Sequence, residues 1–224
     1  MSLIGIGCEQ SRMPTDHSSN PSSDQDHSVS GSVESDTDFS FTAQAKLKHP
    51  RLNIVLVEPE IPNNTGNIGR TCVTTGCRLH LVHPLGFDID EKACRRAGLD
   101  YWPRLDLVEH ENLDRYLHAY PPNAEDQSTP KTWFLTTKAT RTIYDAPIAA
   151  GDHLVFGRES RGLPAHVHEA HPDQRVCVPL VENERSLNLS TCVAIVAYEA
   201  VRKMIGSGEA VVNEQGRLLD PRDM

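Results

Sequence analysis

Short β-branched and aliphatic runs alternate with helical segments along most of this chain, and this alternation limits the possible folds more than any other feature. The first run, Asn53–Val57, is almost continuously apolar, which is typical of a strand buried on both faces of a sheet. Gly76 and Gly98 stand where the helices that follow such strands would end. Strands that alternate with helices predict an α/β fold, in which a mainly parallel sheet carries helices on both faces.

The individual elements can be placed from the same pattern. The expected strands are 53–57, 79–82, a short one near Leu107, 133–136, 153–156 and 175–178. The expected helices are 65–75, 90–97, 113–117, 164–170 and 189–204. At the start of the first helix, the side chain of Asn64 or Thr65 is a candidate cap. Residues 119–131 contain prolines and small polar residues, which indicates a surface loop.

Composition divides the 224-residue chain into one domain and two tails. Residues 1–48 are rich in Ser and Asp and have few large apolar side chains, so we predict a disordered acidic tail. Residues 49–206 form the expected domain, and residues 207–224 a polar C-terminal tail. Because no run of about eighteen apolar residues exists and the N-terminal segment is acidic, we expect a cytoplasmic protein without a membrane span or presequence.

Charge and cysteine content exclude several classes of protein. A net charge of −9 argues against nonspecific coating of nucleic acid, which depends on Lys and Arg side chains, so any RNA contact must be local. The six cysteines lie far apart without a C-x-x-C motif, which indicates reduced thiols. His166, His168 and His171 lie in a polar helical segment, which indicates surface histidines, and we expect no metal.

Three polar segments follow predicted strands, where open α/β sheets place their ligand sites. In the first, Asn67 and Arg70 lie one turn apart near a helix N-terminus, which favours an anionic ligand such as phosphate. In the second, 156–164, two glycines bracket a carboxylate and two arginines and allow close approach of the backbone to a ligand. The third places Ser186 and Asn188 just before the last helix. Helix capping or a plain turn would also explain each segment alone.

Several common sites are missing. The chain has no strand-linked G-x-G-x-x-G, no G-x-x-x-x-G-K-[ST] and no G-x-S-x-G. The signatures of dinucleotide-binding proteins, class I methyltransferases, P-loop proteins and serine hydrolases are therefore absent. A ligand-binding α/β domain without a standard phosphate loop remains.

The predicted last helix has an apolar surface wider than one sheet face would cover. Its main face consists of Leu189, Val193, Val196, Ala197, Ala200 and Val201, and a second stripe of Ala194 and Tyr198 with Cys192 and Ile195 nearby. A central helix in a small core would explain this width. A helix that packs on the sheet with one side and on a second subunit with the other would also explain it.

Taken together, the three segments resemble the motifs of the SPOUT RNA methyltransferases. They read N-x-G-N-x-x-R, F-G-x-E-x-x-G-L-P and V-P-x-(about six)-S-L-N-L-S, in that order. The flanking sequences E-P-E-I-P, R-R-A-G-L-D-Y and Y-E-A narrow the resemblance to the TrmL type, which methylates the 2′-hydroxyl of wobble nucleotides in tRNA. The similarity covers residues 52–204.

This resemblance implies a deep C-terminal trefoil knot, a homodimer, and S-adenosylmethionine (SAM) as methyl donor. The cofactor-binding residues that it implies are Leu135, Gly157, Glu159, Val178, Ser186 and Leu187. Arg70 stands at the position proposed as catalytic in relatives. Because a guanidinium stays protonated, we expect Arg70 to position phosphate and ribose, with Asn67, Ser186 and Asn188 fixing the loop and the nucleotide.

The resemblance also implies a partner, the anticodon stem-loop of tRNA. The candidate RNA contacts are Arg70, Arg95, Arg96, Lys138, Arg141, Arg158 and Arg161. Relatives commonly carry proline where this chain has Arg158, so that contact departs from the family. Two alternatives stay open: a 2′-O-methyltransferase for ribosomal RNA or another tRNA position, and a catalytically silent RNA-binding dimer.

Overall fold

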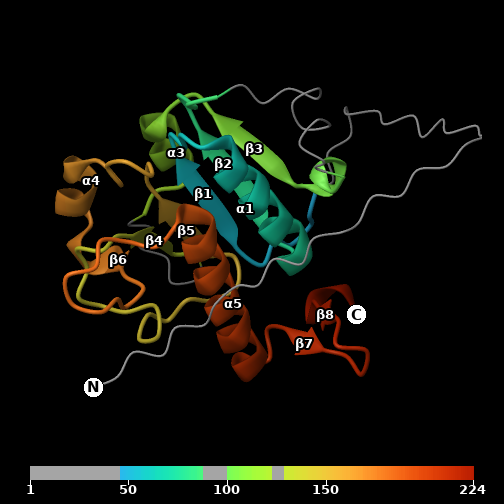
Figure 1. Cartoon of the computed structure of the whole chain (residues 1–224). Helices are drawn as coiled ribbons and strands as arrows, with labels where there is room; N and C mark the ends of the chain where they lie inside the picture. The colour runs from blue at the N-terminus through green and yellow to red at the C-terminus, as the bar shows by residue number, and fades with distance from the viewer. Residues whose placement is uncertain (1–45, 88–99, 123–128) are drawn as a thin grey trace, which may run out of the picture. The chain divides into compact units, whose positions relative to one another are not determined.

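The computed structural model describes residues 46–87, 100–122 and 129–224 (Figure 1). Most of the predicted acidic tail, the helix expected at 90–97 and part of the 119–131 loop lie outside the described residues. Arg95 and Arg96, two of the candidate RNA contacts, lie outside them as well.

Six parallel strands form the central sheet, as the sequence predicted. They are β1 (Asn53–Val57), β2 (Arg78–Val82), β3 (Leu107–His110), β4 (Thr132–Leu135), β5 (His153–Phe156) and β6 (Arg175–Val176). Their spatial order is β3-β2-β1-β5-β4-β6, and every adjacent pair is parallel. The carboxyl ends of β4, β5 and β6 therefore meet at one edge of the sheet.

Helices cover both faces of this sheet. They are α1 (Pro62–Thr75), α3 (Leu113–Ala119), α4 (Ala165–Ala170) and α5 (Leu189–Ser207), with short 3₁₀ turns at Trp102–Arg104, Pro172–Gln174 and Pro221–Asp223. Ile54 and Leu56 point to the face covered by α1 and α5, which pack against each other (Figure 1). Val55 and Val57 point to the face covered by α3 and α4. The alternation along β1 thus supplies apolar side chains to two separate cores.

The first helix starts earlier than its sequence suggested. We expected Asn64 or Thr65 as the cap, but α1 begins at Pro62, and Ile61 at the cap position makes no side-chain hydrogen bond. Proline suits the first helical position because its missing N–H has no partner there in any case. The asparagine is therefore free for another role. At the other end, Gly76 ends α1 with φ +69, as predicted.

The C-terminal segment contains more structure than a polar tail. The strands β7 (Val211–Val212) and β8 (Leu218–Leu219) pair as an antiparallel hairpin. Ala210 is buried before the hairpin, and Arg222 donates to the His49 carbonyl at 3.4 Å after it. At the other end of the domain, Arg78 Nη2 on β2 donates to the Leu47 carbonyl at 3.2 Å, so residues before the expected boundary at 49 also contact the sheet.

The loop after β4 lies against the last helix. Lys203 Nζ on α5 donates to the carbonyls of Tyr144 and Ala146, at 2.7 and 2.9 Å. The trefoil knot that the resemblance implies is not tested by these contacts and stays a prediction. Within the described ranges, no helix is both long enough and apolar enough to cross a bilayer.

Imidazole rings lie under α3, and we call His80, His110 and His153 the histidine cluster. His80 is fully buried, with Nδ1 2.9 Å from His110 Nε2 and Nε2 3.1 Å from Asn53 Oδ1. His153 Nδ1 lies 2.8 Å from the Tyr116 hydroxyl. Burial, together with neighbouring positive charge, lowers the pKa of His80 to about 2 and that of His153 to about 4. Both rings are neutral in the folded protein at neutral pH.

Candidate active site

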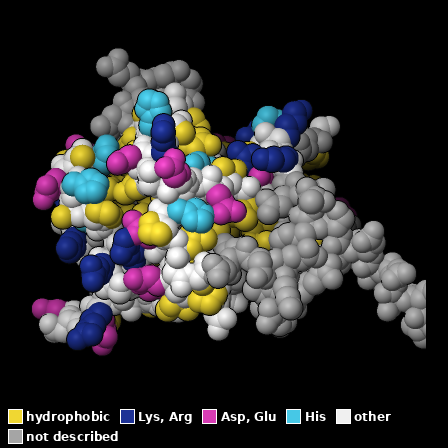
Figure 2. All heavy atoms as spheres, turned by 90° about the horizontal axis from the view of Figure 1, so that it is seen from above, with side chains coloured by type: hydrophobic (Ala, Val, Ile, Leu, Met, Phe, Trp, Pro, Cys, Tyr) yellow, Lys and Arg dark blue, Asp and Glu magenta, His cyan; other side chains and the backbone are white. Residues whose placement is uncertain are grey.

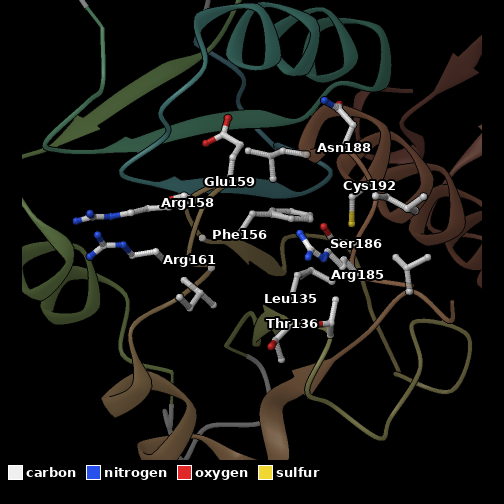
Figure 3. A pocket seen from close by; sticks show the side chains of 18 of the residues that line it. Leu135, Thr136, Phe156, Arg158, Glu159, Arg161, Arg185, Ser186, Asn188 and Cys192 are labelled. Atoms are coloured by element: carbon white, nitrogen blue, oxygen red, sulfur yellow. The ribbon is translucent and has the colours of Figure 1, made fainter. Parts of the chain in front are cut away.

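The three polar segments meet at one cavity of about 500 Å³, at the carboxyl ends of β4 and β5 and beside the N-terminus of α5 (Figure 3). All six residues expected to bind the cofactor line it: Leu135, Gly157, Glu159, Val178, Ser186 and Leu187. Asn188 lines it too. Its volume falls in the range of about 300–1,000 Å³ that is usual for small-molecule sites.

Gly157 makes the cavity wall compact. A Cβ atom at this position would overlap the carbonyl carbon of Gly162 and the nitrogen of Leu163, so no other residue fits without movement of the backbone. Gly162 N in turn donates to the Arg158 carbonyl at 2.8 Å, and Gly162 has φ +70. Residues 157–162 therefore form a closed loop that requires glycine at both ends.

Glu159 joins this loop to the start of α1. Its Oε2 accepts from Glu60 N and its Oε1 from Asn64 Nδ2, both at 2.9 Å. The Oδ1 atom of Asn64 accepts from Asn188 Nδ2 at 3.0 Å, and Asn188 Oδ1 caps α5 by accepting from Ser190 N. Asn64 is buried, with 5% of its surface exposed. One chain of hydrogen bonds thus links all three motifs through a residue that we had expected only to cap a helix.

Asn67 and Arg70 lie elsewhere. Both are exposed on α1, and neither lines the cavity of their own chain. Arg70 Nη2 lies 3.2 Å from Asp100 Oδ1, and the guanidinium carbon lies 4.7 Å from the centre of the Tyr101 ring. The first motif is therefore divided between the cavity and the outer surface of the helix.

The candidate RNA contacts are also divided. Lys138, Arg158 and Arg161 line the cavity, together with Arg185, which the sequence analysis did not single out. Arg141 lies outside the lining and donates to the Asp173 carbonyl at 2.9 Å. On the face shown in Figure 2, Lys and Arg side chains are scattered among acidic ones and form no single large basic patch.

The titratable lining of the cavity includes His168 and Cys192. Burial raises the pKa of the Cys192 thiol to about 11, so it stays protonated at neutral pH. Burial and the charges of Lys138 and Arg175 lower the pKa of His168. His168 is half-buried rather than a surface residue, and so is His171, whose ring stacks on Phe134. In the described part of the chain, no group of three or more His, Cys, Asp or Glu residues could hold a metal ion.

Comparisons with known proteins identify this parallel α/β sheet, whose three loop motifs converge on one cavity, as an RNA methyltransferase of the SPOUT class. The comparisons are specific: residues 51–198 match the sequence model of the SpoU rRNA Methylase family, and the chain belongs to that family. The resemblance stated from the motifs is thereby confirmed.

Curated relatives share much of this sequence. The tRNA (cytidine(34)-2′-O)-methyltransferase of Saccharophagus degradans is 46% identical over 153 residues, which cover 68% of this chain and 95% of that protein. The enzyme of the same name from Escherichia coli strain K12 is 46% identical, with 68% and 94% covered.

Solved structures agree with the sequence comparison. One described as "Structural insights into the 2-OH methylation of C/U34 on tRNA" superposes with a TM-score of 0.62 at 39% identity, and covers 70% of this chain and 98% of that one. The SpoU methyltransferase AviRb from Streptomyces viridochromogenes in complex with AdoMet has a TM-score of 0.61. It is 19% identical, with 71% and 60% covered, and shows the shared fold alone.

Proposed function

We propose that this chain transfers a methyl group from SAM to the ribose 2′-hydroxyl of the wobble nucleotide of tRNA, a cytidine or a modified uridine. The observation that carries this proposal is the convergence of the three motifs on one cavity. The names of the relatives at 46% identity support the choice of tRNA and of nucleotide 34. A cytoplasmic location stays a prediction.

The cavity suits the proposed cofactor. It combines apolar side chains, such as Leu135 and Phe156, with loop backbone that Gly157 brings close, and this mixture accommodates a nucleoside with an amino-acid tail. When bound, SAM supplies a methyl group on a sulfonium sulfur. The fixed loop walls would exclude water and orient the ligand, so that positioning rather than metal chemistry is the task of the protein.

Arg70 requires a second copy of the chain in this proposal. Arg70 is exposed on α1 and does not line the cavity of its own chain, whereas α5, which packs on α1, exposes Ile195, Tyr198 and Ile205. We propose that these apolar side chains lie in a homodimer interface, and that Arg70 of one copy serves the cavity of the other. Its planar guanidinium would then hold the phosphate and ribose of the target nucleotide.

The residues at the mouth of the cavity complete the proposed site. Ser186 is exposed there, and Asn188 is held by its bonds to Asn64 and α5. We assign Asn67, Ser186 and Asn188 to fixing the loop and the nucleotide. Lys138 and Arg161, which line the cavity, are proposed contacts to the anticodon stem-loop.

The test is transfer of labelled methyl from SAM to total tRNA that lacks the wobble ribose methyl, followed by mapping of the label. Label on the 2′-oxygen of nucleotide 34 is the expected result. Label at another position, or in ribosomal RNA only, would replace the substrate by the nearest alternative within the family. Absence of both transfer and SAM binding would favour a silent RNA-binding dimer.

A further inference from the structure

The segment after β1 and the loop after β5 are joined by an ion pair and by hydrogen bonds that involve three successive residues of the loop. The carboxylate of Glu58 pairs with the guanidinium of Arg158. The carboxylate of Glu60 accepts from Ser160 N and Ser160 Oγ, at 2.9 and 2.8 Å. In the opposite direction, Glu159 accepts from Glu60 N at 2.9 Å. Residues 158, 159 and 160 are therefore all tied to the segment 58–60.

The backbone conformation and the burial of Glu58 favour this contact. Its backbone has φ +51, a left-handed conformation that is uncommon for a residue other than glycine. Its amide donates to the Val82 carbonyl at 2.8 Å, which fixes the backbone, and 17% of its side chain is exposed. A strained conformation persists where the surrounding structure holds it, and such positions cluster at functional sites. This turn brings a half-buried carboxylate to Arg158 and leaves it little access to solvent.

Arg158 in turn belongs to the wall of the cavity. Its carbonyl closes the 157–162 loop by accepting from Gly162 N, and its side chain extends away from Ser186 and Asn188 (Figure 3). A guanidinium already neutralised by Glu58 would have to give up that pair before it could neutralise a phosphate. Arg161, also in the lining, is exposed and has no ion pair with any residue that the structure describes.

We propose that Arg158 is a positioning residue for the cofactor cavity and not an RNA contact, because its pair with Glu58 holds the 157–162 loop in its binding shape. This inference rests on the proposed binding of SAM. It separates two arginines of one loop: Arg158 acts on cofactor affinity, whereas Arg161 acts on tRNA affinity.

The experiment measures two quantities on the full chain, the Kd for SAM by calorimetry and the dependence of tRNA binding on salt. Arg158→Ala and Glu58→Gln should each raise the Kd for SAM about tenfold. The double variant should have a Kd no higher than that of the more affected single variant, because the two residues act as one unit. The log–log slope of tRNA binding against salt should not change in Arg158→Ala. In the matched variant Arg161→Ala it should fall by about 0.7 to 0.9, the effect of one lost phosphate contact.

A general loss of folding is distinguished by a conservative variant. Arg158→Lys keeps the cation on a flexible stem, so it should retain the wild-type circular dichroism spectrum and give a Kd between those of the wild type and Arg158→Ala. An unchanged Kd for SAM in Arg158→Ala and Glu58→Gln, or a shallower salt slope in Arg158→Ala, would overturn the inference while the proposed function stands. Failure of the wild-type protein to bind SAM would overturn both.

Discussion

Acid should weaken this fold through its buried histidines. In the unfolded chain, each ring takes up a proton near its ordinary pKa of 6.5, whereas the folded protein holds the pKa of His80 at about 2 and that of His153 at about 4. Between about pH 4 and 6.5 the unfolded state therefore binds more protons than the folded state. Stability contributed by these groups is complete above pH 6.5 and is lost as the pH falls below it.

The size of the loss follows from the same values. At about pH 5, the unfolded chain gains roughly 2 kcal/mol for each of these two rings by taking up protons, or about 4 kcal/mol for the pair. Desolvation is the main cause for both, and both side chains are buried, so solvent screening does little to reduce the effect. A domain of this size is stable by about 5–15 kcal/mol, so the loss would be easily measured.

Urea unfolding followed by tryptophan fluorescence at about pH 8 and about pH 5 checks this prediction. We expect His80→Gln to reduce the pH-dependent change in unfolding free energy by roughly 2 kcal/mol, whatever its effect on overall stability. If His80→Gln cannot fold, His153→Gln provides the same comparison. Equal pH dependence in the wild type and both cluster variants would refute the reasoning.

Three further predictions concern the site. Arg70→Lys should lose most methyl transfer and keep the wild-type Kd for SAM, because lysine lacks the planar donor fork; retained turnover would contradict this role. Asn64→Ala should lower the unfolding free energy by about 1–3 kcal/mol and weaken SAM binding, since Glu159 and Asn188 both lose a partner, whereas the exposed Asn63→Ala should do neither. Gly157→Ala should abolish SAM binding in calorimetry, and a normal Kd would show that the loop can shift.

Sequence reasoning found the sheet because buried parallel strands have a strong local signature. Asn53–Val57 and His153–Phe156 were placed at their observed bounds, since a short apolar run between turn residues has few other structures available. The helix after β1 was placed three residues late. Asparagine and threonine are strong capping candidates by type, but Pro62 can begin a helix without any side-chain cap, and the sequence alone does not show which option the chain uses.

The sequence marked several of the residues that line the cavity, but not the contacts between them. Motifs mark Glu159 and Asn188 as candidates, yet Asn64, which links them, lies 95 residues from Glu159 and 124 residues from Asn188 in the sequence. A local pattern carries no information about such distant pairs. Arg185 was not predicted either, because it lies in a polar segment in which the sequence does not distinguish one exposed residue from another.

The helical period of α1 explains why the residues of the first motif lie on two different faces of the helix. Successive residues of an α-helix are rotated by about 100°, so the side chains of Asn64 and Arg70 point about 120° apart and cannot face the same cavity. The structure follows this geometry, with Asn64 buried against Glu159 and Arg70 exposed beside Asp100. This geometry supports the proposed homodimer, in which Arg70 of one copy serves the cavity of the other. Mixed dimers of Arg70→Ala with a cavity variant such as Gly157→Ala should consequently regain activity at one of their two sites, whereas each variant alone should remain inactive.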